Sequence, residues 1–257
     1  MNGTGHYQLL ALDMDGTLLN EDKQVTLETR KWIRRAVEAG FQVIVSTGRG
    51  RQSALPYVEE LGLKGPMVLV NGSEVWKSPN ELLVRELMPL DEIRELRRLA
   101  LERDIWYWAY TTGGVLNRED WPDGEEESRL DWLKFGFYTE DARALAELRS
   151  MLEADGRFEV TNSHPCNLEL NPKNVNKSRG VAKVCHLLGI PMSQVIALGD
   201  SINDLDMIRD AGLGIAMGNA QEEVKRQADA VTADNEHDGV ALVIRRYLFG
   251  EEMELLP

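Results

Sequence analysis

The sequence has few of the features of a secreted or membrane-spanning protein. Its only cysteines are Cys166 and Cys185, so a disulfide framework is excluded and buried free thiols in a reducing compartment are expected, although the spacing would permit one disulfide. Asp13 interrupts the one N-terminal apolar stretch, which therefore does not resemble a signal peptide. No apolar run approaches membrane-spanning length. These absences predict a cytoplasmic protein with no membrane partner.

Positive charge is also scarce. Lysine and arginine number 29 against 43 aspartates and glutamates, which gives a formal net charge of −14. Such a surface repels nucleic acid unless a basic patch stands out, and none does, so no nucleic-acid partner is expected. An anionic ligand would need local cations or a metal. His6, His186 and His237 have no metal-ligand spacing with one another. No pattern indicates an oligomeric state.

The two ends of the chain alternate strand and helix signals, which predicts an α/β fold with a parallel sheet covered by helices. Near the N-terminus we expect helices at 26–39 and 52–61, and strands that end at Asp13, at 41–46 and at 67–70. Near the C-terminus we expect helices at 177–188, 204–210, 221–227 and 239–248, and strands at 195–198, 213–216 and 230–232.

The middle of the chain has a different pattern. Its strands look amphipathic and paired, with helices between them, as in a mostly antiparallel α+β unit. The expected strands are 105–110, 133–138 and 158–161, and the expected helices are 91–103 and 141–154. We therefore divide the chain into a core, residues 1–81 and 172–257, and an inserted α+β domain, residues 82–171.

Two aspartates follow the first apolar strand. Alternate residues of an extended strand share a face, so Asp13 and Asp15 are expected to point the same way. Two such carboxylates repel each other, and a divalent cation would remove that conflict. Gly16 permits a sharp turn after the strand. An Asx-rich turn after an edge strand explains this segment equally well.

Polar residues follow other strands of the predicted sheet. The strand at 41–46 leads into Thr47, Gly48 and Arg49, which can donate hydrogen bonds to an anion but also fit a turn before a helix. Arg49 is compatible with a phosphate contact or a structural salt bridge. Lys177 begins a helix, where a cation opposes the helix dipole slightly, and a solvated surface lysine is the simpler interpretation.

A second pair of carboxylates follows the strand at 195–198. Asp200 lies at the strand end, and Asn203 and Asp204 come one helical turn later. At the carboxyl edge of a parallel sheet these residues would meet Asp13 and Asp15. Carboxylates gathered there require a cation, and hard oxygen ligands suit Mg²⁺ better than Zn²⁺.

Taken together and in order, these motifs are specific. The chain resembles the haloacid dehalogenase superfamily of phosphohydrolases, and more narrowly its Cof-type sugar-phosphate phosphatases. The resemblance covers nearly the full length and rests on Asp-x-Asp-Gly-Thr, Thr-Gly-Arg, a helix-start lysine and Gly-Asp-x-x-Asn-Asp. It implies a Rossmann-like core with a cap inserted between the second and third motifs, at 82–171, where a lid would exclude water and contact substrate.

The resemblance also implies a Mg²⁺-dependent phosphatase of small phosphorylated metabolites. Asp13 would be the nucleophile that forms an aspartyl-phosphate, and Asp15 the acid and base. The implied phosphate-binding residues are Met14, Thr47, Gly48, Lys177 and Asn203. The implied metal ligands are Asp13, Asp15 through its backbone carbonyl, Asp200 and Asp204, the last directly or through water.

Two other functions stay open. A phosphomannomutase-like phosphotransferase shares the Asp-x-Asp-Gly-Thr motif and the position of the cap. A phospho-ligand sensor with a vestigial site is disfavoured because every expected catalytic position is filled. Within the cap, Trp106, Trp108, Trp121 and Trp132 are expected to pack the sheet rather than to bind a sugar ring, and His164 is expected in an exposed loop.

Overall fold

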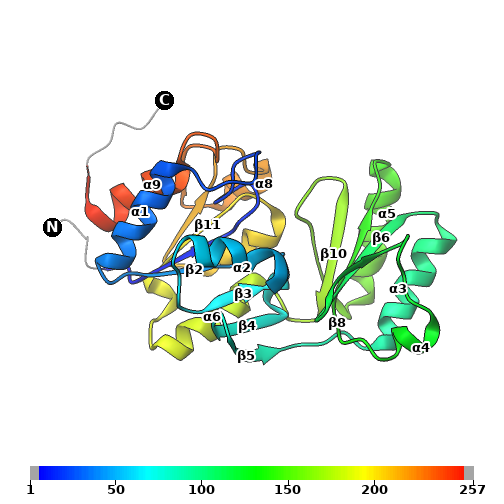
Figure 1. Cartoon of the computed structure of the whole chain (residues 1–257). Helices are drawn as coiled ribbons and strands as arrows, with labels where there is room; N and C mark the ends of the chain where they lie inside the picture. Colours follow the sequence, from blue (N-terminus) through cyan, green and yellow to red (C-terminus); the bar gives the residue numbers. More distant parts are fainter. Residues whose placement is uncertain (1–5, 252–257) are drawn as a thin grey trace.

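The computed structural model describes residues 6–251, whose elements are arranged around two main sheets (Figure 1). The first sheet has five parallel strands in the order β13-β12-β11-β1-β2, as the alternating pattern predicts. They are β1 (Leu9–Leu12), β2 (Gln42–Val45), β11 (Val195–Gly199), β12 (Leu213–Ala216) and β13 (Ala230–Val231). A parallel bridge from Ser46 to Val68 places β3 (Met67–Leu69) beside β2.

The central strand β1 is apolar throughout because helices cover both faces of this sheet. Leu10 and Leu12 belong to one apolar cluster, which includes residues of helices α1, α2 and α9. Leu9 and Ala11 belong to a second cluster, with residues of α6 and α7. The covering helices are α1 (Leu27–Glu38), α2 (Arg51–Glu60), α6 (Lys177–Leu188), α7 (Leu205–Asp210), α8 (Glu222–Gln227) and α9 (Gly239–Val243), which continues as a π-helical turn (Ile244–Leu248).

Local signals set the ends of these helices. The Thr26 side chain caps α1 by accepting a hydrogen bond from the Thr29 amide at 3.1 Å. Asn176 caps α6 in the same way, with the Arg179 amide at 2.9 Å. Gly189 ends α6 in the left-handed conformation, at φ 69°. The cap at Asn176 fixes Lys177 as the first residue of α6.

The second main sheet is antiparallel, with the order β7-β6-β8-β10-β9. Its strands are β6 (Trp106–Thr111), β7 (Gly114–Asn117), β8 (Trp132–Tyr138), β9 (Phe158–Thr161) and β10 (Asn167–Pro172). Helices α3 (Leu90–Glu102) and α5 (Ala142–Asp155) cover the face turned away from the first sheet, and α4 (Gly124–Glu127) is a single turn (Figure 1). The predicted α+β character is therefore confirmed.

The tryptophans of this region occupy two environments. Trp121 and Trp132 stack with their ring centroids 5.0 Å apart and pack in the apolar cluster between the sheet and its helices. Trp106 and Trp108 alternate along β6 with Tyr107, which is buried in that cluster, and so lie on the opposite face. The expectation that the tryptophans pack the sheet against its helices is therefore correct for Trp121 and Trp132 but not for Trp106 and Trp108.

A hairpin connects the two sheets. β4 (Glu74–Ser78) pairs with β3 and with β5 (Glu81–Arg85), so β5 continues past residue 81, at which the sequence places the first domain boundary. The division into a core and a cap stays a prediction. Residues 82–171 are called the predicted cap.

Candidate active site

The predicted site residues lie at the carboxyl ends of three adjacent parallel strands. Asp13 follows β1, Asp200 follows β11 and Thr47 comes two residues after β2. β1 pairs with both of the other strands, so their ends lie next to each other at one edge of the sheet. This is the edge at which open α/β sheets bind ligands.

Lys177 joins two of the predicted carboxylates. Its Nζ lies 2.6 Å from Oδ1 of Asp13 and 2.6 Å from Oδ1 of Asp204. The lysine side chain is fully buried, which costs free energy unless opposite charges surround it. Burial alone would lower the Lys177 pKa, but the two carboxylates outweigh it and raise the pKa above its ordinary value. Lys177 is therefore a buried cation of the site and not a solvated surface lysine.

Asp200 completes a group of three carboxylates. One oxygen each from Asp13, Asp200 and Asp204 lies within 4.8 Å of the others. Burial, followed by repulsion from Asp204, raises the pKa of Asp13 well above its usual value and that of Asp200 to about 7. Lys177 only partly offsets this repulsion.

A divalent cation fits this group, because it would supply the positive charge that the crowded carboxylates lack. Both oxygens of Asp204 are engaged: Oδ1 accepts from Lys177, and Oδ2 accepts from the amides of Asp200 and Ser201, each at 3.1 Å. Asp204 is thus placed to organise the loop and to reach a cation through water.

The Asp15 carboxylate does not join this group. Arg49 donates to it twice, from Nε at 2.6 Å and from Nη2 at 2.7 Å, and Lys23 donates at 3.0 Å. The expectation that the Asp15 carboxylate would gather with that of Asp13 is wrong, because β1 ends at Leu12 and the two-residue period ends with it. Gly16, at φ 79°, turns the chain directly afterwards.

The hydrogen-bond partners of Asp15 determine its charge. Burial raises the pKa of this carboxyl, but the hydrogen bonds and charge of Arg49, and then those of Lys23, lower it to about 2. Asp15 is therefore ionised in this structure. From the sequence, Arg49 was compatible with either a phosphate contact or a salt bridge. The structure shows the salt bridge, with Asp15.

Apart from Lys177, the predicted phosphate-binding residues lie in the loops that follow β1, β2 and β11. Thr47 is buried, and its hydroxyl accepts from the Arg49 amide at 3.1 Å. Asn203 is buried next to Asp204, and within the described residues its Oδ1 has no hydrogen-bond partner. Met14 is fully buried, and its carbonyl accepts from the amide of Leu19 at 2.8 Å.

Side chains of the predicted cap reach this site. Lys134 of β8 donates to the Gly48 carbonyl at 3.0 Å, and Asn71 donates to Glu169 of β10 at 2.6 Å. Sequence reasoning did not identify Lys134 and Glu169 as site residues. The alternation of Glu169 with the buried Leu168 and Leu170 was the available signal, since it places a carboxylate on the face opposite the cap's apolar core.

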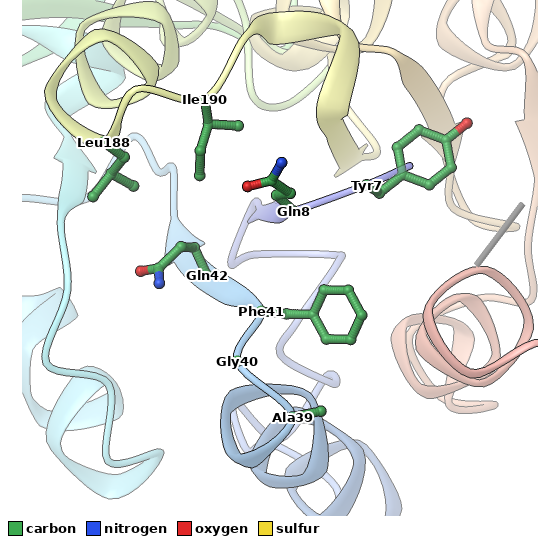
Figure 2. A pocket seen from close by; sticks show the side chains of 8 residues that line it. All are labelled: Tyr7, Gln8, Ala39, Gly40, Phe41, Gln42, Leu188 and Ile190. Carbon is green, nitrogen blue, oxygen red and sulfur yellow. The ribbon is translucent and has the colours of Figure 1, made fainter. Parts of the chain in front are cut away.

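A cavity lies far from this chemistry. Its volume is about 300 Å³, and its lining includes Tyr7 and Gln8, directly before β1, and Phe41 and Gln42 at the start of β2 (Figure 2). These are the amino ends of the strands, the edge opposite Asp13. The cavity contains none of the predicted site residues.

Comparison with known proteins gives one consistent family. The sequence model of a family described as haloacid dehalogenase-like hydrolase matches residues 10–244. The chain is 42% identical over 241 residues to the 5-amino-6-(5-phospho-D-ribitylamino)uracil phosphatase YcsE of Bacillus subtilis (strain 168), covering 94% of this chain and 96% of that protein. It is 32% identical to another phosphatase of that name, YitU of the same organism, with 93% and 97% covered.

The fold comparison agrees. A solved haloacid dehalogenase-like hydrolase from B. subtilis superimposes with a TM-score of 0.84 at 25% identity, covering 93% of this chain and 99% of the other. Within residues 6–251, no helix has the length and apolar character needed to cross a membrane.

Proposed function

The chain belongs to the haloacid dehalogenase-like hydrolases and is a phosphatase, and we propose that it hydrolyses phosphate monoesters of small polyhydroxylated metabolites with Mg²⁺, in the cytoplasm. The observation that supports this most directly is the buried Lys177 between Asp13 and Asp204, with Asp200 beside them. Lys177, together with a divalent cation held by these carboxylates, can offset the charge of a phosphoryl group, and Asp13 can present a nucleophile to it.

In this proposal Asp13 attacks phosphorus. A bond forms between a carboxylate oxygen and phosphorus, and the bond from phosphorus to the ester oxygen breaks. Lys177, which already holds Asp13, offsets the negative charge that gathers there. Thr47, the Gly48 and Met14 backbone, and Asn203 hold the phosphoryl oxygens.

Asp15 moves the protons. It protonates the departing alkoxide, then takes a proton from the water that attacks the aspartyl-phosphate, which releases phosphate and restores the Asp13 carboxylate. Because Asp15 is ionised while Arg49 and Lys23 hold it, the substrate phosphate must draw these cations away, and Asp15 must take a proton from solvent before it can protonate the alkoxide.

The cation would be held by Asp13, Asp200 and the Asp15 carbonyl. Asp204 would reach it through water. When bound, Mg²⁺ would supply a fixed positive charge that ionises Asp13 and polarises the phosphate. The donor set is made of oxygen atoms alone, with no histidine or cysteine in the group of three carboxylates, and this supports Mg²⁺ over softer metals.

The substrate proposal rests on the relatives. YcsE and YitU are named for a phosphorylated ribitylamino compound, so this ester is the first candidate and sugar phosphates are the wider class.

Phosphate release tests the proposal. The protein is incubated with Mg²⁺ and a panel that contains 5-amino-6-(5-phospho-D-ribitylamino)uracil, several sugar phosphates and a hexose bisphosphate, with Asp13→Asn as the control. We expect release from at least one ester, and a loss of about 10³-fold or more in the variant. Isomer formation without free phosphate would instead identify a mutase, and equal turnover by the variant would refute Asp13 as the nucleophile.

A further inference from the structure

The strongest unexplained feature is a buried ion pair that the proposed reaction does not use. Lys134 of β8 and Glu169 of β10 lie 3.1 Å apart, with 1% and 6% of their side chains exposed. Burying two opposite charges gives little net stability compared with an apolar pair. Stability alone therefore does not explain why Lys134 and Glu169 are buried together.

The contacts of the pair cross from the predicted cap to the phosphate-binding loops. Lys134 donates to the carbonyl of Gly48, whose amide is a proposed phosphate donor. A Cβ added to Gly48 would lie 3.0 Å from Asn71 Oδ1, 3.4 Å from Lys134 Nζ and 3.6 Å from Glu169 Oε2. The three side chains thus pack directly on the Gly48 backbone.

Glu169 reaches the second loop through Asn71. Asn71 Nδ2 donates to Glu169 at 2.6 Å, and Asn71 Oδ1 accepts from Asn203 Nδ2 at 3.4 Å. The Asn71 amide also donates to the Thr47 carbonyl at 3.0 Å. Asn71 itself adopts the left-handed conformation at φ 55°, which the surrounding contacts must stabilise.

A third connection runs through the loop after β9. The Ser163 hydroxyl donates to Glu169 at 2.9 Å, and the Ser163 carbonyl accepts from the Ser201 hydroxyl at 3.3 Å. The neighbouring Asn162 carbonyl accepts from the Asn203 amide at 3.0 Å. Glu169 is therefore linked to the loops that carry Thr47, Asn71 and Asn203.

We propose that Lys134 and Glu169 are positioning residues that order the phosphate-binding loops when the cap lies over the site. This inference rests on the proposed function and adds to it. The pair does not contact substrate: within the described residues Glu169 is already engaged by Lys134, Asn71 and Ser163. Moving the cap away would withdraw the partners of Gly48 and Asn71 together, so the phosphate site is complete only while the cap is closed.

The test compares the double variant Lys134→Met/Glu169→Gln with Glu127→Gln. The double change leaves no unpaired buried charge. Glu127 is a matched control because it is a buried carboxylate of the cap, paired with Arg94 at 2.6 Å, with its described contacts inside the cap. Lys134→Gln/Glu169→Gln, which also leaves no unpaired buried charge, serves as a second variant if the first double variant does not fold, as judged by thermal unfolding.

The first measurement is inhibition by inorganic phosphate, together with KM and kcat for p-nitrophenyl phosphate and for a sugar phosphate. We expect the phosphate inhibition constant and both KM values to rise by about ten-fold, with a smaller change in kcat, because the phosphate site is disturbed and the leaving group is not. An effect on one ester alone, or no change in phosphate inhibition, would overturn the proposal.

The second measurement is amide hydrogen exchange at residues 47–49 and 201–203, without substrate or metal. Exchange should accelerate there in the double variant and stay unchanged in Glu127→Gln. Unchanged exchange in the double variant would refute the positioning role. This readout is independent of activity, so it still decides the proposal if the wild type releases phosphate from no ester and the proposed function fails.

Discussion

Arg49 holds Asp15 through two hydrogen bonds, Nε to Oδ2 at 2.6 Å and Nη2 to Oδ1 at 2.7 Å. This paired geometry is among the strongest that a carboxylate and an arginine can form. It keeps Asp15 apart from the group formed by Asp13, Asp200 and Asp204. Asp15, the proposed acid and base, is therefore ionised in this structure.

Replacing Arg49 with Gln should raise the Asp15 pKa from about 2 toward its ordinary value. We expect a rise of about one unit, because Lys23 remains as a partner. The titration of the Asp15 carboxyl carbon, followed by NMR in metal-free protein, measures this change. Arg51→Gln is the control, since Arg51 binds the Pro79 carbonyl instead. An unchanged titration in Arg49→Gln would show that Arg49 does not control the charge of Asp15.

Replacing Lys177 with Met should destabilise the metal-free protein strongly. The change leaves Asp13 and Asp204 buried without their shared cation, a situation that typically costs about 3–5 kcal/mol. Urea unfolding at neutral pH measures the loss. Lys183→Met, on the same helix, removes only the half-exposed pair with Glu86 and should cost under about 1 kcal/mol. Similar losses in both variants would contradict the importance of the buried cation.

The sequence predicts the parts of the site that depend on strand ends, and misses those that depend on turns and distant pairing. Asp13 and Asp200 come together because the apolar runs before them form adjacent parallel strands. The gathering of the Asp15 carboxylate with that of Asp13 was predicted wrongly, because a strand period was applied to a turn.

The contribution of the cap was missed for a different reason. Lys134 and Glu169 are distant in sequence and meet because β8 and β10 pair, with Leu170 opposite Phe135. Local patterns in a single sequence contain no information on that register. The unexpected Lys134–Glu169 pair is thus a product of long-range strand pairing.

The metal-free protein should lose stability as the pH rises from about 4 to about 7. Asp200 has a pKa of about 7 in the folded protein against an ordinary 3.8, so between these values the folded state binds more protons than the unfolded state. The free energy of unfolding then falls with rising pH, by about 4 kcal/mol at most for this one group.

Urea unfolding at a series of pH values, after treatment with a chelator, measures this slope. Saturating Mg²⁺ should flatten it, because the cation binds the ionised carboxylates and stabilises the folded state. Asp200→Asn should flatten it without metal. A metal-free protein whose stability does not decline over this range would argue against the crowding of Asp13, Asp200 and Asp204.

Replacing Gly16 with Ala should weaken metal binding as well as stability. Gly16 has φ 79°, and an added Cβ would lie 2.6 Å from Oδ2 of Asp200, closer than real contacts allow. Gly40→Ala separates the two effects, since Gly40 has φ 92° but nothing within 4 Å of an added Cβ.

Both variants should lose about 1 kcal/mol from backbone strain. Only Gly16→Ala must also displace Asp200, so calorimetric titration with Mg²⁺ should show reduced affinity in that variant and wild-type affinity in Gly40→Ala. Equal affinities in the two variants would mean that Asp200 does not hold the cation.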